Sequence, residues 1–314
     1  MKPEIIMIGP MLKTAMDELE ASYTVHRYWE AEDKPALLAA TGPRIRAIAT
    51  DGASGVPEAV MAACPKIELI ASFGVGYDGI DIPAAQERGI RVTTTPDVLN
   101  DCMAEITLGL MIALAHRLPQ ADHWVRQGEW ARHRKAFGLT HELTGKTVGI
   151  LGLGRIGKEI ATRCQAMKMR VVYHGRREQA HQPYRYYERL EDMAREVDWL
   201  VVIAPGSAET KGIVSRRVME ALGPDGFLVN VGRGTLIDEP AMVELLASGA
   251  LGGAALDVFE DEPNVPNELF SLENVVLSPH QGSATHKTRF QMGDLLVANM
   301  AAHFAGAPLV TPLV

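Results

Sequence analysis

The sequence predicts an α/β protein built from two doubly wound domains, each with a parallel sheet, and a cleft between them. Short apolar segments of β-type alternate with helical patterns through most of the chain, as in stacked βαβ units. One of these segments runs into a glycine-rich turn that opens a helix. The chain of 314 residues is long enough for two domains of ordinary size.

The expected strands are the apolar segments themselves, because parallel strands covered on both faces read as continuous apolar runs. In chain order they are residues 4–9, 45–50, 67–73, 146–152, 169–174, 198–204 and 226–231, then the apolar run of "GGAAL" before Asp257, and residues 274–279. A long helix is expected from Asp101, which can cap its start, to about Arg126. Its apolar stripe consists of Ala104, Leu108, Met111 and Ala115.

The domain boundary is expected near Thr93–Asp101, where Pro96 interrupts the pattern. A final helix covers about 283–304, and so few residues follow it that we expect it to return to the N-terminal domain. The predicted layout is a discontinuous, flavodoxin-like substrate domain (1–99 and 283–314) and a continuous dinucleotide-binding domain (100–282).

The composition excludes several classes of partner. A net charge of −8 argues against nucleic-acid and anionic-membrane binding. The longest apolar stretch, Ile106–Ala115, is too short to span a bilayer, and the N-terminus lacks a signal-peptide pattern. Three widely spaced cysteines favour a reducing cytoplasm.

The glycine-rich turn is "GLGRIG", with glycines at 152, 154 and 157. The first glycine permits a tight turn, the second lets a pyrophosphate approach the backbone, and the third allows the helix to pack closely on the strand. A helix N-terminus also offers N–H groups and partial positive charge to phosphates. This context favours a dinucleotide site over a purely structural turn.

The next strand ends about 20 residues later, where a ribose-binding acid is expected in NAD-dependent proteins. Gly175 stands there instead, followed by Arg176 and Arg177. The glycine removes the repulsion of a 2′-phosphate, and two guanidinium groups match phosphate geometry. A solvated loop is the alternative, but its position in the chain favours NADP(H) as cofactor.

Three loops at strand ends carry polar residues suited to hydride transfer with a 2-oxo acid. Arg233, Glu262 and His280 each follow a predicted strand, and the carboxyl ends of such strands converge on the ligand. An arginine can bind a carboxylate and polarise a keto group, while a protonated histidine oriented by a carboxylate can donate a proton to the carbonyl oxygen. Each residue alone could be an ordinary surface group; the joint placement predicts a catalytic site.

On these residues, the chain resembles the D-isomer-specific 2-hydroxyacid dehydrogenases over essentially its whole length. The matching motifs are "GILGLGRIG", "VNVGRGTLIDEPAMVELLASGALGGAALDVFEDEP", "ENVVLSPHQGSAT" and "SFGVGYDGIDIPAAQERGIRVTTTPDVLND". The likeness is greatest to NADPH-dependent glyoxylate/hydroxypyruvate and hydroxyphenylpyruvate reductases, which share the "GRR"-like turn.

The resemblance implies that Arg233, Glu262 and His280 form the catalytic triad, with His280 as proton donor. It implies that backbone N–H groups around Val75 and Gly76 bind the substrate carboxylate, together with Arg233 and His280. The implied cofactor contacts are Gly152, Leu153, Gly154, Arg155, Ile156, Gly157, Gly175, Arg176, Arg177, Pro205, Thr210, Val231, Gly232, Arg233, Asp257, His280 and Gly282. Asp257 resembles the residue that contacts the nicotinamide carboxamide, and Pro205 and Thr210 resemble the lining of the adenosine pocket.

The family also implies a homodimer, with an arm around Leu118–Trp130. One departure is Gln281, where the family usually has an apolar residue; it either alters the substrate pocket or faces solvent.

No metal site is expected, because His116, His123, His133 and His141 are too widely spaced to form a ligand set.

The leading hypothesis is a cytoplasmic, NADPH-dependent reductase of small 2-oxo acids, glyoxylate and hydroxypyruvate first, yielding D-2-hydroxy acids. One alternative keeps the reaction with a bulkier substrate such as an aryl-pyruvate. Another is a dinucleotide sensor without activity, similar to the corepressors of this family. Turnover of a panel of 2-oxo acids with NADPH and NADH separates these readings.

Overall fold

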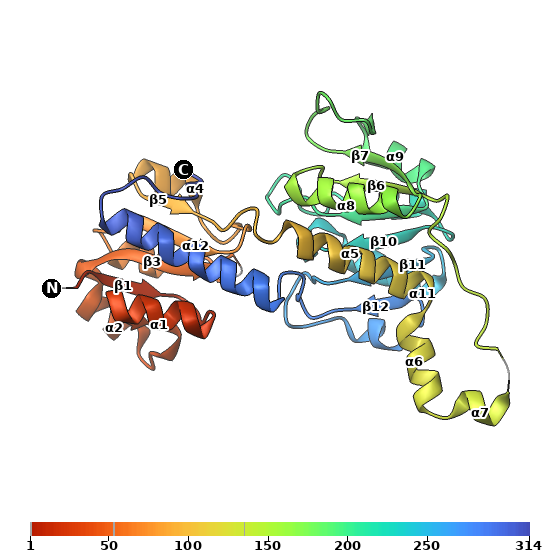
Figure 1. Ribbon diagram of the computed structural model, residues 1–314, viewed down its shortest axis with the longest axis horizontal. Helices are drawn as coiled ribbons and strands as arrows, with labels where there is room; N and C mark the ends of the chain where they lie inside the picture. Colours follow the sequence, from red (N-terminus) through yellow and green to blue (C-terminus); the bar gives the residue numbers. More distant parts are fainter. Residues whose placement is uncertain (1, 53, 135) are drawn as a thin grey trace. The chain divides into compact units, whose positions relative to one another are not determined.

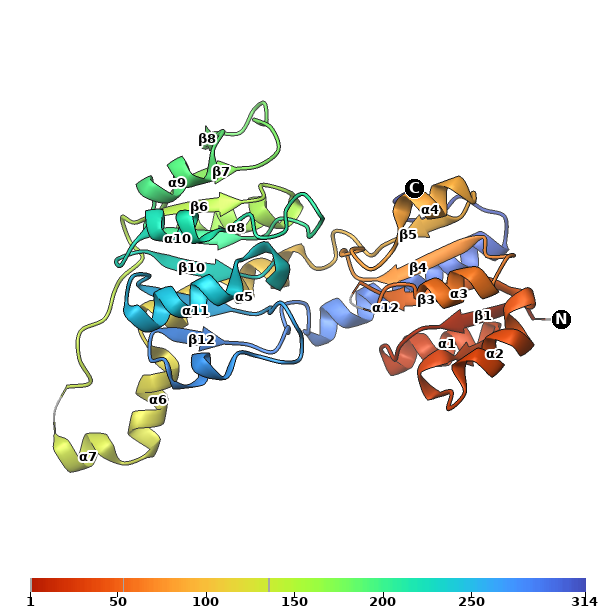
Figure 2. The ribbon, with the colours of Figure 1, turned by 180° about the vertical axis from the view of Figure 1, so that it is seen from behind.

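The computed structural model describes residues 2–52, 54–134 and 136–314. The chain divides into two compact units, Met1–Leu99 with Ser283–Val314 and Asn100–Gly282, which we call the terminal unit and the central unit. The expected domain ranges include residues 1, 53 and 135, which lie outside the described part. Each unit contains one parallel β-sheet with helices (Figures 1 and 2), which confirms the predicted fold class.

The terminal unit has a five-stranded parallel sheet in the order β2-β1-β3-β4-β5. Its strands are β1 (Glu4–Met7), β2 (Thr24–Arg27), β3 (Ile45–Asp51), β4 (Leu69–Phe73) and β5 (Arg91–Thr93). Its helices are α1 (Lys13–Ser22), α2 (Lys34–Thr41), α3 (Glu58–Ala63), α4 (Ile82–Glu87) and α12 (His286–Phe304), with 3₁₀ turns at Tyr28–Glu30 and Gly42–Arg44. Figures 1 and 2 show α12 on one face of this sheet and α3 on the other.

Helix α12 belongs to the terminal unit because its residues are fitted to that unit's core. Thr285 caps the helix by accepting a hydrogen bond from the Thr288 N–H at 3.2 Å. Gly293 lets α12 approach α1 closely, since an added Cβ would lie 3.1 Å from Cβ of Ala15. The chain then returns to the sheet edge, where the Leu313 N–H donates to the Val92 carbonyl at 2.8 Å.

The central unit has a seven-stranded parallel sheet in the order β12-β11-β10-β9-β6-β7-β8. Its strands are β6 (Thr147–Leu151), β7 (Arg170–His174), β8 (Arg185–Tyr187), β9 (Trp199–Val202), β10 (Phe227–Asn230), β11 (Gly253–Leu256) and β12 (Val275–Leu277). Its helices are α5 (Asn100–Ala115), α6 (Leu118–Arg126), α7 (Glu129–His133), α8 (Arg155–Ala166), α9 (Leu190–Glu196), α10 (Arg216–Leu222) and α11 (Glu239–Ser248), with 3₁₀ turns at Gly234–Leu236 and Asn267–Ser271.

Helices cover both faces of the central sheet. In Figure 1, α5 and α8 lie together in front of the strands, and in Figure 2 α9, α10 and α11 cover the opposite face. The predicted apolar stripe of α5 is buried as expected, at Ala104, Leu108, Met111 and Ala115. Helices α6 and α7 extend away from this sheet in Figure 1; we call residues 118–133 the arm.

The prediction of one helix from Asp101 to Arg126 is wrong. Helix α5 ends at Ala115, Arg117 adopts a left-handed conformation with φ 52°, and α6 begins with proline in its first turn. Asp101 is not the cap either, because the helix begins at Asn100. The Asp101 carboxylate instead accepts a hydrogen bond from Arg163 at 2.6 Å.

Three strands were not expected from the sequence, namely β2, β5 and β8. All three lie at sheet edges and have at most four residues, some of them exposed. An edge strand buries only part of its surface, so it needs no continuous apolar run. The apolar pattern that identified the central strands and the edge strand β12 is missing from these three.

Candidate active site

The turn after β6 has the backbone that a dinucleotide site requires. Gly152 has φ +104°, and a Cβ there would lie 2.8 Å from the Ala204 nitrogen. At Gly157, an added Cβ would lie 2.2 Å from the Gly152 carbonyl oxygen. A larger residue would therefore clash with neighbouring backbone at Gly152 and Gly157. At Gly154 it would not, because an added Cβ there lies within 4 Å of no described atom.

Gly154 is the N-cap residue of α8 and provides no side chain to satisfy the N–H groups of the first turn. The start of this helix is therefore open to an anion. Leu153 is buried, whereas Arg155 is exposed and Ile156 is half-buried. These features fit the pyrophosphate of a dinucleotide.

The loop after β7 presents two positive charges. Arg176 and Arg177 are exposed, and within the described part of the chain neither has an ion-pair partner. Gly175 has open space around it, since an added Cβ would meet nothing described within 4 Å. A carboxylate could thus be accommodated at this position, and its absence is a chemical feature of the site.

Arg233 follows β10 in a loop shaped by the last residue of that strand. The buried Asn230 side chain accepts from the Gly232 N–H at 3.1 Å and donates to the Arg233 carbonyl at 2.9 Å. The Arg233 guanidinium donates to the Gly232 carbonyl at 2.7 Å. Asn230 was not among the residues expected from the sequence, although a polar residue that ends an otherwise apolar strand was a usable signal.

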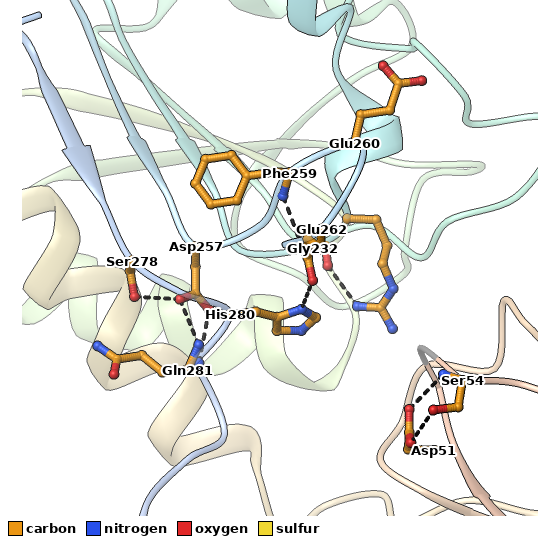
Figure 3. Close-up of polar contacts among 12 residues, drawn as sticks. Asp51, Ser54, Gly232, Asp257, Phe259, Glu260, Glu262, Ser278, His280 and Gln281 are labelled. Carbon is orange, nitrogen blue, oxygen red and sulfur yellow. Dashed lines mark hydrogen bonds and ion pairs between the residues drawn. The ribbon is translucent and has the colours of Figure 1, made fainter. Parts of the chain in front are cut away.

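The structure brings Glu262 and His280 into direct contact (Figure 3). The Oε2 atom of Glu262 lies 2.6 Å from Nδ1 of His280, and Oε1 accepts from the Phe259 N–H at 3.1 Å. Burial raises the pKa of Glu262, but hydrogen bonds from His280 and Phe259 and the charges of His280 and Arg233 outweigh burial, so its pKa lies below the ordinary value. The carboxylate is ionised near neutral pH and can stabilise a charged imidazole.

His280 itself is exposed and has a left-handed backbone, with φ 48°. This conformation costs a non-glycine residue free energy, and such strain concentrates at functional sites. The described residues offer no hydrogen-bond partner to Nε2 of His280. The imidazole is therefore held on one side and accessible on the other.

Asp257 holds the loop that carries His280. It is 1% exposed, and its carboxylate accepts from the Ser278 hydroxyl at 2.6 Å and from the Gln281 and Gly282 N–H groups at 2.9 Å (Figure 3). The Asp257 carbonyl also accepts from the His280 N–H at 2.8 Å. Asp257 thus fixes the backbone on both sides of the histidine.

Other expected cofactor residues lie at neighbouring strand ends of the same sheet. The Thr210 hydroxyl donates to the Pro205 carbonyl at 3.0 Å, which closes the loop after β9. Val231 and Gly232 are buried directly after β10. Gly282 is buried too, and a Cβ there would lie 2.6 Å from the Met103 sulfur.

Gln281 does not face the histidine. Its side chain is exposed, and in Figure 3 it extends away from the imidazole of His280.

The terminal unit contains the expected carboxylate-binding loop after β4. Gly74 has φ +135° and is fixed by Thr95: the Gly74 N–H donates to the threonine hydroxyl at 3.0 Å, and the Thr95 N–H donates to the Gly74 carbonyl at 2.7 Å. Val75 and Gly76 follow and are half-buried. No group among the described residues accepts a hydrogen bond from either N–H, so both amides can serve an anion.

No group of three or more His, Cys, Asp and Glu side chains in residues 2–52, 54–134 and 136–314 could hold a metal ion. Over the same residues, no single helix is long and apolar enough to cross a membrane. Helices α5 and α6 are long and apolar enough only when taken together, and the two helices are bent by 62° relative to each other at the break between them.

Comparison with known proteins gives a consistent result. Residues 108–282 match the model of the D-isomer specific 2-hydroxyacid dehydrogenase NAD binding domain. The chain is 45% identical over 310 residues to a glyoxylate/hydroxypyruvate reductase A of Arabidopsis thaliana, covering 99% of this chain and 98% of that protein. It is 44% identical to a hydroxyphenylpyruvate reductase of Plectranthus scutellarioides, with the same coverage.

Among solved structures, the chain is similar to an NADPH-dependent glyoxylate/hydroxypyruvate reductase from Sinorhizobium meliloti in complex with NADP and malonate. The TM-score is 0.95 at 43% identity, covering 100% of this chain and 97% of that one.

Proposed function

Since this chain belongs to the D-isomer-specific 2-hydroxyacid dehydrogenase family, we propose that it reduces small 2-oxo acids, glyoxylate and hydroxypyruvate first, to D-2-hydroxy acids with NADPH. As a member of that family it is an enzyme that uses a nicotinamide dinucleotide. The observation that carries the proposal is the 2.6 Å contact between Glu262 and the accessible imidazole of His280. The names of the similar proteins support the choice of substrate class.

The proposed chemistry assigns one task to each side chain of the triad. A bound nicotinamide dinucleotide supplies the hydride. His280 donates a proton from Nε2 to the carbonyl oxygen of the substrate, and the ionised Glu262 at Nδ1 favours the protonated imidazole before the reaction. Arg233 polarises the keto group and binds the substrate carboxylate, as its planar guanidinium suits both tasks.

The central unit is the proposed dinucleotide-binding domain, and the terminal unit is the proposed substrate domain. The open start of α8 would receive the pyrophosphate, since Gly154 leaves its first N–H groups uncapped. The amides of Val75 and Gly76 would bind the substrate carboxylate. Asp257 is proposed to contact the nicotinamide carboxamide as well as to hold the histidine loop, because a carboxylate can accept more hydrogen bonds than Ser278, Gln281 and Gly282 supply.

NADPH is the proposed cofactor because Gly175, Arg176 and Arg177 combine open space with two exposed guanidinium groups. The similar reductase from Sinorhizobium meliloti is described as NADPH-dependent, which supports this assignment.

We also propose a homodimer formed through the arm. Leu118, Val125 and Trp130 are 49%, 50% and 60% exposed, and large apolar side chains of this kind are enriched at interfaces. Cys64 and Cys164 are buried free thiols, which supports a reducing compartment such as the cytoplasm.

A bulkier substrate is the second candidate, because one similar protein is a hydroxyphenylpyruvate reductase at 44% identity. Steady-state oxidation of NADPH and NADH with glyoxylate, hydroxypyruvate and aryl-pyruvates separates the candidates. We expect the highest kcat/KM with NADPH and a small 2-oxo acid. A maximum with an aryl-pyruvate would replace the substrate assignment, equal use of NADH would replace the cofactor assignment, and tight NADPH binding without turnover would indicate a sensor.

A further inference from the structure

The loop that carries Arg176 and Arg177 is held at both ends by side chains that take no part in the proposed chemistry. We call residues 175–179 the arginine loop. At its start, the Tyr186 hydroxyl donates to the Gly175 carbonyl at 3.2 Å. At its end, the Gln179 N–H donates to the Tyr173 hydroxyl oxygen at 2.7 Å. The two arginines therefore lie between two anchored positions.

The two tyrosines that anchor the loop are themselves fixed. Tyr173 in β7 and Tyr186 in β8 are directly paired across the parallel ladder, and their ring centroids are 5.3 Å apart. Tyr173 is 1% exposed, so its hydroxyl is an immobile acceptor. The anchor at the end of the loop is therefore part of the sheet.

The Gln179 side chain makes a second connection. Its Nε2 donates to the Leu153 carbonyl at 2.8 Å, and Leu153 lies between Gly152 and Gly154 in the turn at the start of α8. One residue thus links the turn that fits a pyrophosphate to the loop that fits a 2′-phosphate. The covalent structure of NADP limits the distance between its pyrophosphate and its 2′-phosphate. The distance between the glycine turn and the arginine loop therefore affects binding only of a dinucleotide that carries the 2′-phosphate.

We propose that Gln179 is a positioning residue that gives the enzyme its preference for NADPH by holding the arginine loop at a set distance from the glycine turn. This inference rests on the proposed use of NADPH. Arginine side chains lose conformational freedom when they bind, and a loop that is already ordered leaves less ordering to be done on binding. Without Gln179 the guanidinium groups remain, but the loop must be ordered by the ligand.

The test compares binding of dinucleotides with and without the 2′-phosphate. Dissociation constants of NADP⁺ and NAD⁺ are measured by calorimetry for the wild type and Gln179→Leu. Losing one hydrogen bond corresponds to an affinity change of about three- to tenfold, so we expect NADP⁺ to bind about three- to tenfold more weakly and NAD⁺ to change by less than about twofold. In Gln179→Leu, binding of adenosine 2′,5′-bisphosphate should weaken as binding of NADP⁺ does, whereas binding of 5′-AMP should change as little as binding of NAD⁺.

Two further variants distinguish positioning from a general effect on the fold. Tyr173→Phe removes the hydroxyl that accepts from the Gln179 N–H, and it should weaken binding of NADP⁺ more than binding of NAD⁺. Tyr184→Phe is the matched control, because its hydroxyl bonds to the exposed Gln165 at 2.9 Å outside the arginine loop, and it should change neither constant. If Gln179→Leu fails to fold, Gln179→Met keeps the approximate length of the side chain and removes its donor without adding a charge.

A double-mutant cycle tests whether Gln179 acts through the arginines. In an Arg176→Ser/Arg177→Ser background, Gln179→Leu should cause no further loss of NADP⁺ affinity. A full additional loss, or equal weakening of NAD⁺ and NADP⁺, would overturn the role of Gln179. A wild type that binds NADP⁺ no more tightly than NAD⁺ would overturn both this inference and the proposed cofactor. If the wild type prefers NADP⁺ and Gln179→Leu keeps the same ratio of the NAD⁺ and NADP⁺ dissociation constants, the role of Gln179 is rejected and the proposed cofactor stands.

Discussion

Two histidine–glutamate pairs of this molecule have the same composition and opposite environments. In the central unit, His280 lies 2.6 Å from Glu262, its side chain is 42% exposed, and its backbone is left-handed. In the terminal unit, His303 lies 3.1 Å from Glu68 in the regular helix α12, and its side chain is 3% exposed. Only the first pair is open to a small ligand.

The charges around the two imidazoles also differ. Nδ1 of His303 contacts the Arg91 guanidinium, which can only donate, and Glu68 is shared with Arg46 through two hydrogen bonds at 2.9 and 2.8 Å. Burial, and then the charge of Arg91, lower the pKa of His303. A neutral, enclosed imidazole serves packing, whereas an accessible imidazole with its own carboxylate can exchange a proton. Whether a histidine–glutamate pair serves proton transfer or packing therefore depends on its burial and on the charges around it, and not on the two residue types alone.

The largest expected effect separates the two histidines by activity. His280→Ala should lower kcat by about 10²- to 10⁴-fold, because a general acid contributes roughly that factor. Its midpoint of urea unfolding should fall only slightly, since the side chain is 42% exposed and the replacement removes one hydrogen bond, that with Glu262. His303→Ala is the control and should leave the kcat of the folded enzyme unchanged. Comparable losses of kcat in both variants would contradict the distinction.

The next effect concerns the carboxylate of the catalytic pair. Glu262→Gln keeps the shape of the side chain but removes the charge that favours the protonated imidazole, so kcat should fall by about tenfold, as for an interaction of roughly 1.4 kcal/mol. Glu68→Gln is the matched variant in the other pair and should leave kcat within about twofold of the wild type. Steady-state rates at saturating cofactor and substrate measure both. Unchanged kcat in Glu262→Gln would mean that the carboxylate does not assist His280.

The smallest effect is on stability as a function of pH. Because the pKa of His303 is lowered in the folded state, the unfolded chain takes up a proton that the folded protein resists. The free energy of unfolding should therefore fall as the pH drops below the ordinary histidine value of 6.5, by at most about 1.4 kcal/mol per pH unit for this one group.

Glu262 acts in the same direction at lower pH. Its lowered pKa stabilises the fold above the ordinary value of 4.5, and this contribution is lost as the pH falls through its folded-state pKa. Urea unfolding at pH 7.5, 6.0 and 5.0 should show a slope in the wild type and a smaller slope in His303→Leu. Equal slopes would assign the pH dependence to other groups.

Much of the fold was predictable because most of its strands carry a local signal. The apolar runs that become β1, β3, β4, β6, β7, β9, β10, β11 and β12 are buried in the sheets, and burial requires apolar residues. The edge strands β2, β5 and β8 carry no such signal. The break after Ala115 was missed although Pro119, in the first turn of α6, was a usable signal for a new helix; the left-handed backbone of Arg117 turns the chain there.

The candidate site was predictable only in part. The positions of Arg233, Glu262 and His280 after successive strands were readable, since parallel strands end at one edge of a sheet. The roles of Asn230, Ser278 and Gln179 were not, because each depends on a hydrogen bond to a loop whose course the sequence does not reveal.

Local sequence patterns were enough to predict the two parallel sheets, the glycine turn and the residues available for chemistry at the strand ends. These follow from hydrophobic periodicity and from the steric needs of glycine, which act over a few residues. The tertiary structure decided which histidine is enclosed and which is accessible, and which side chains hold the arginine loop and the histidine loop. Those outcomes depend on burial and charge contributed by residues far apart in the chain, such as Arg91 at His303 and Asp257 at His280.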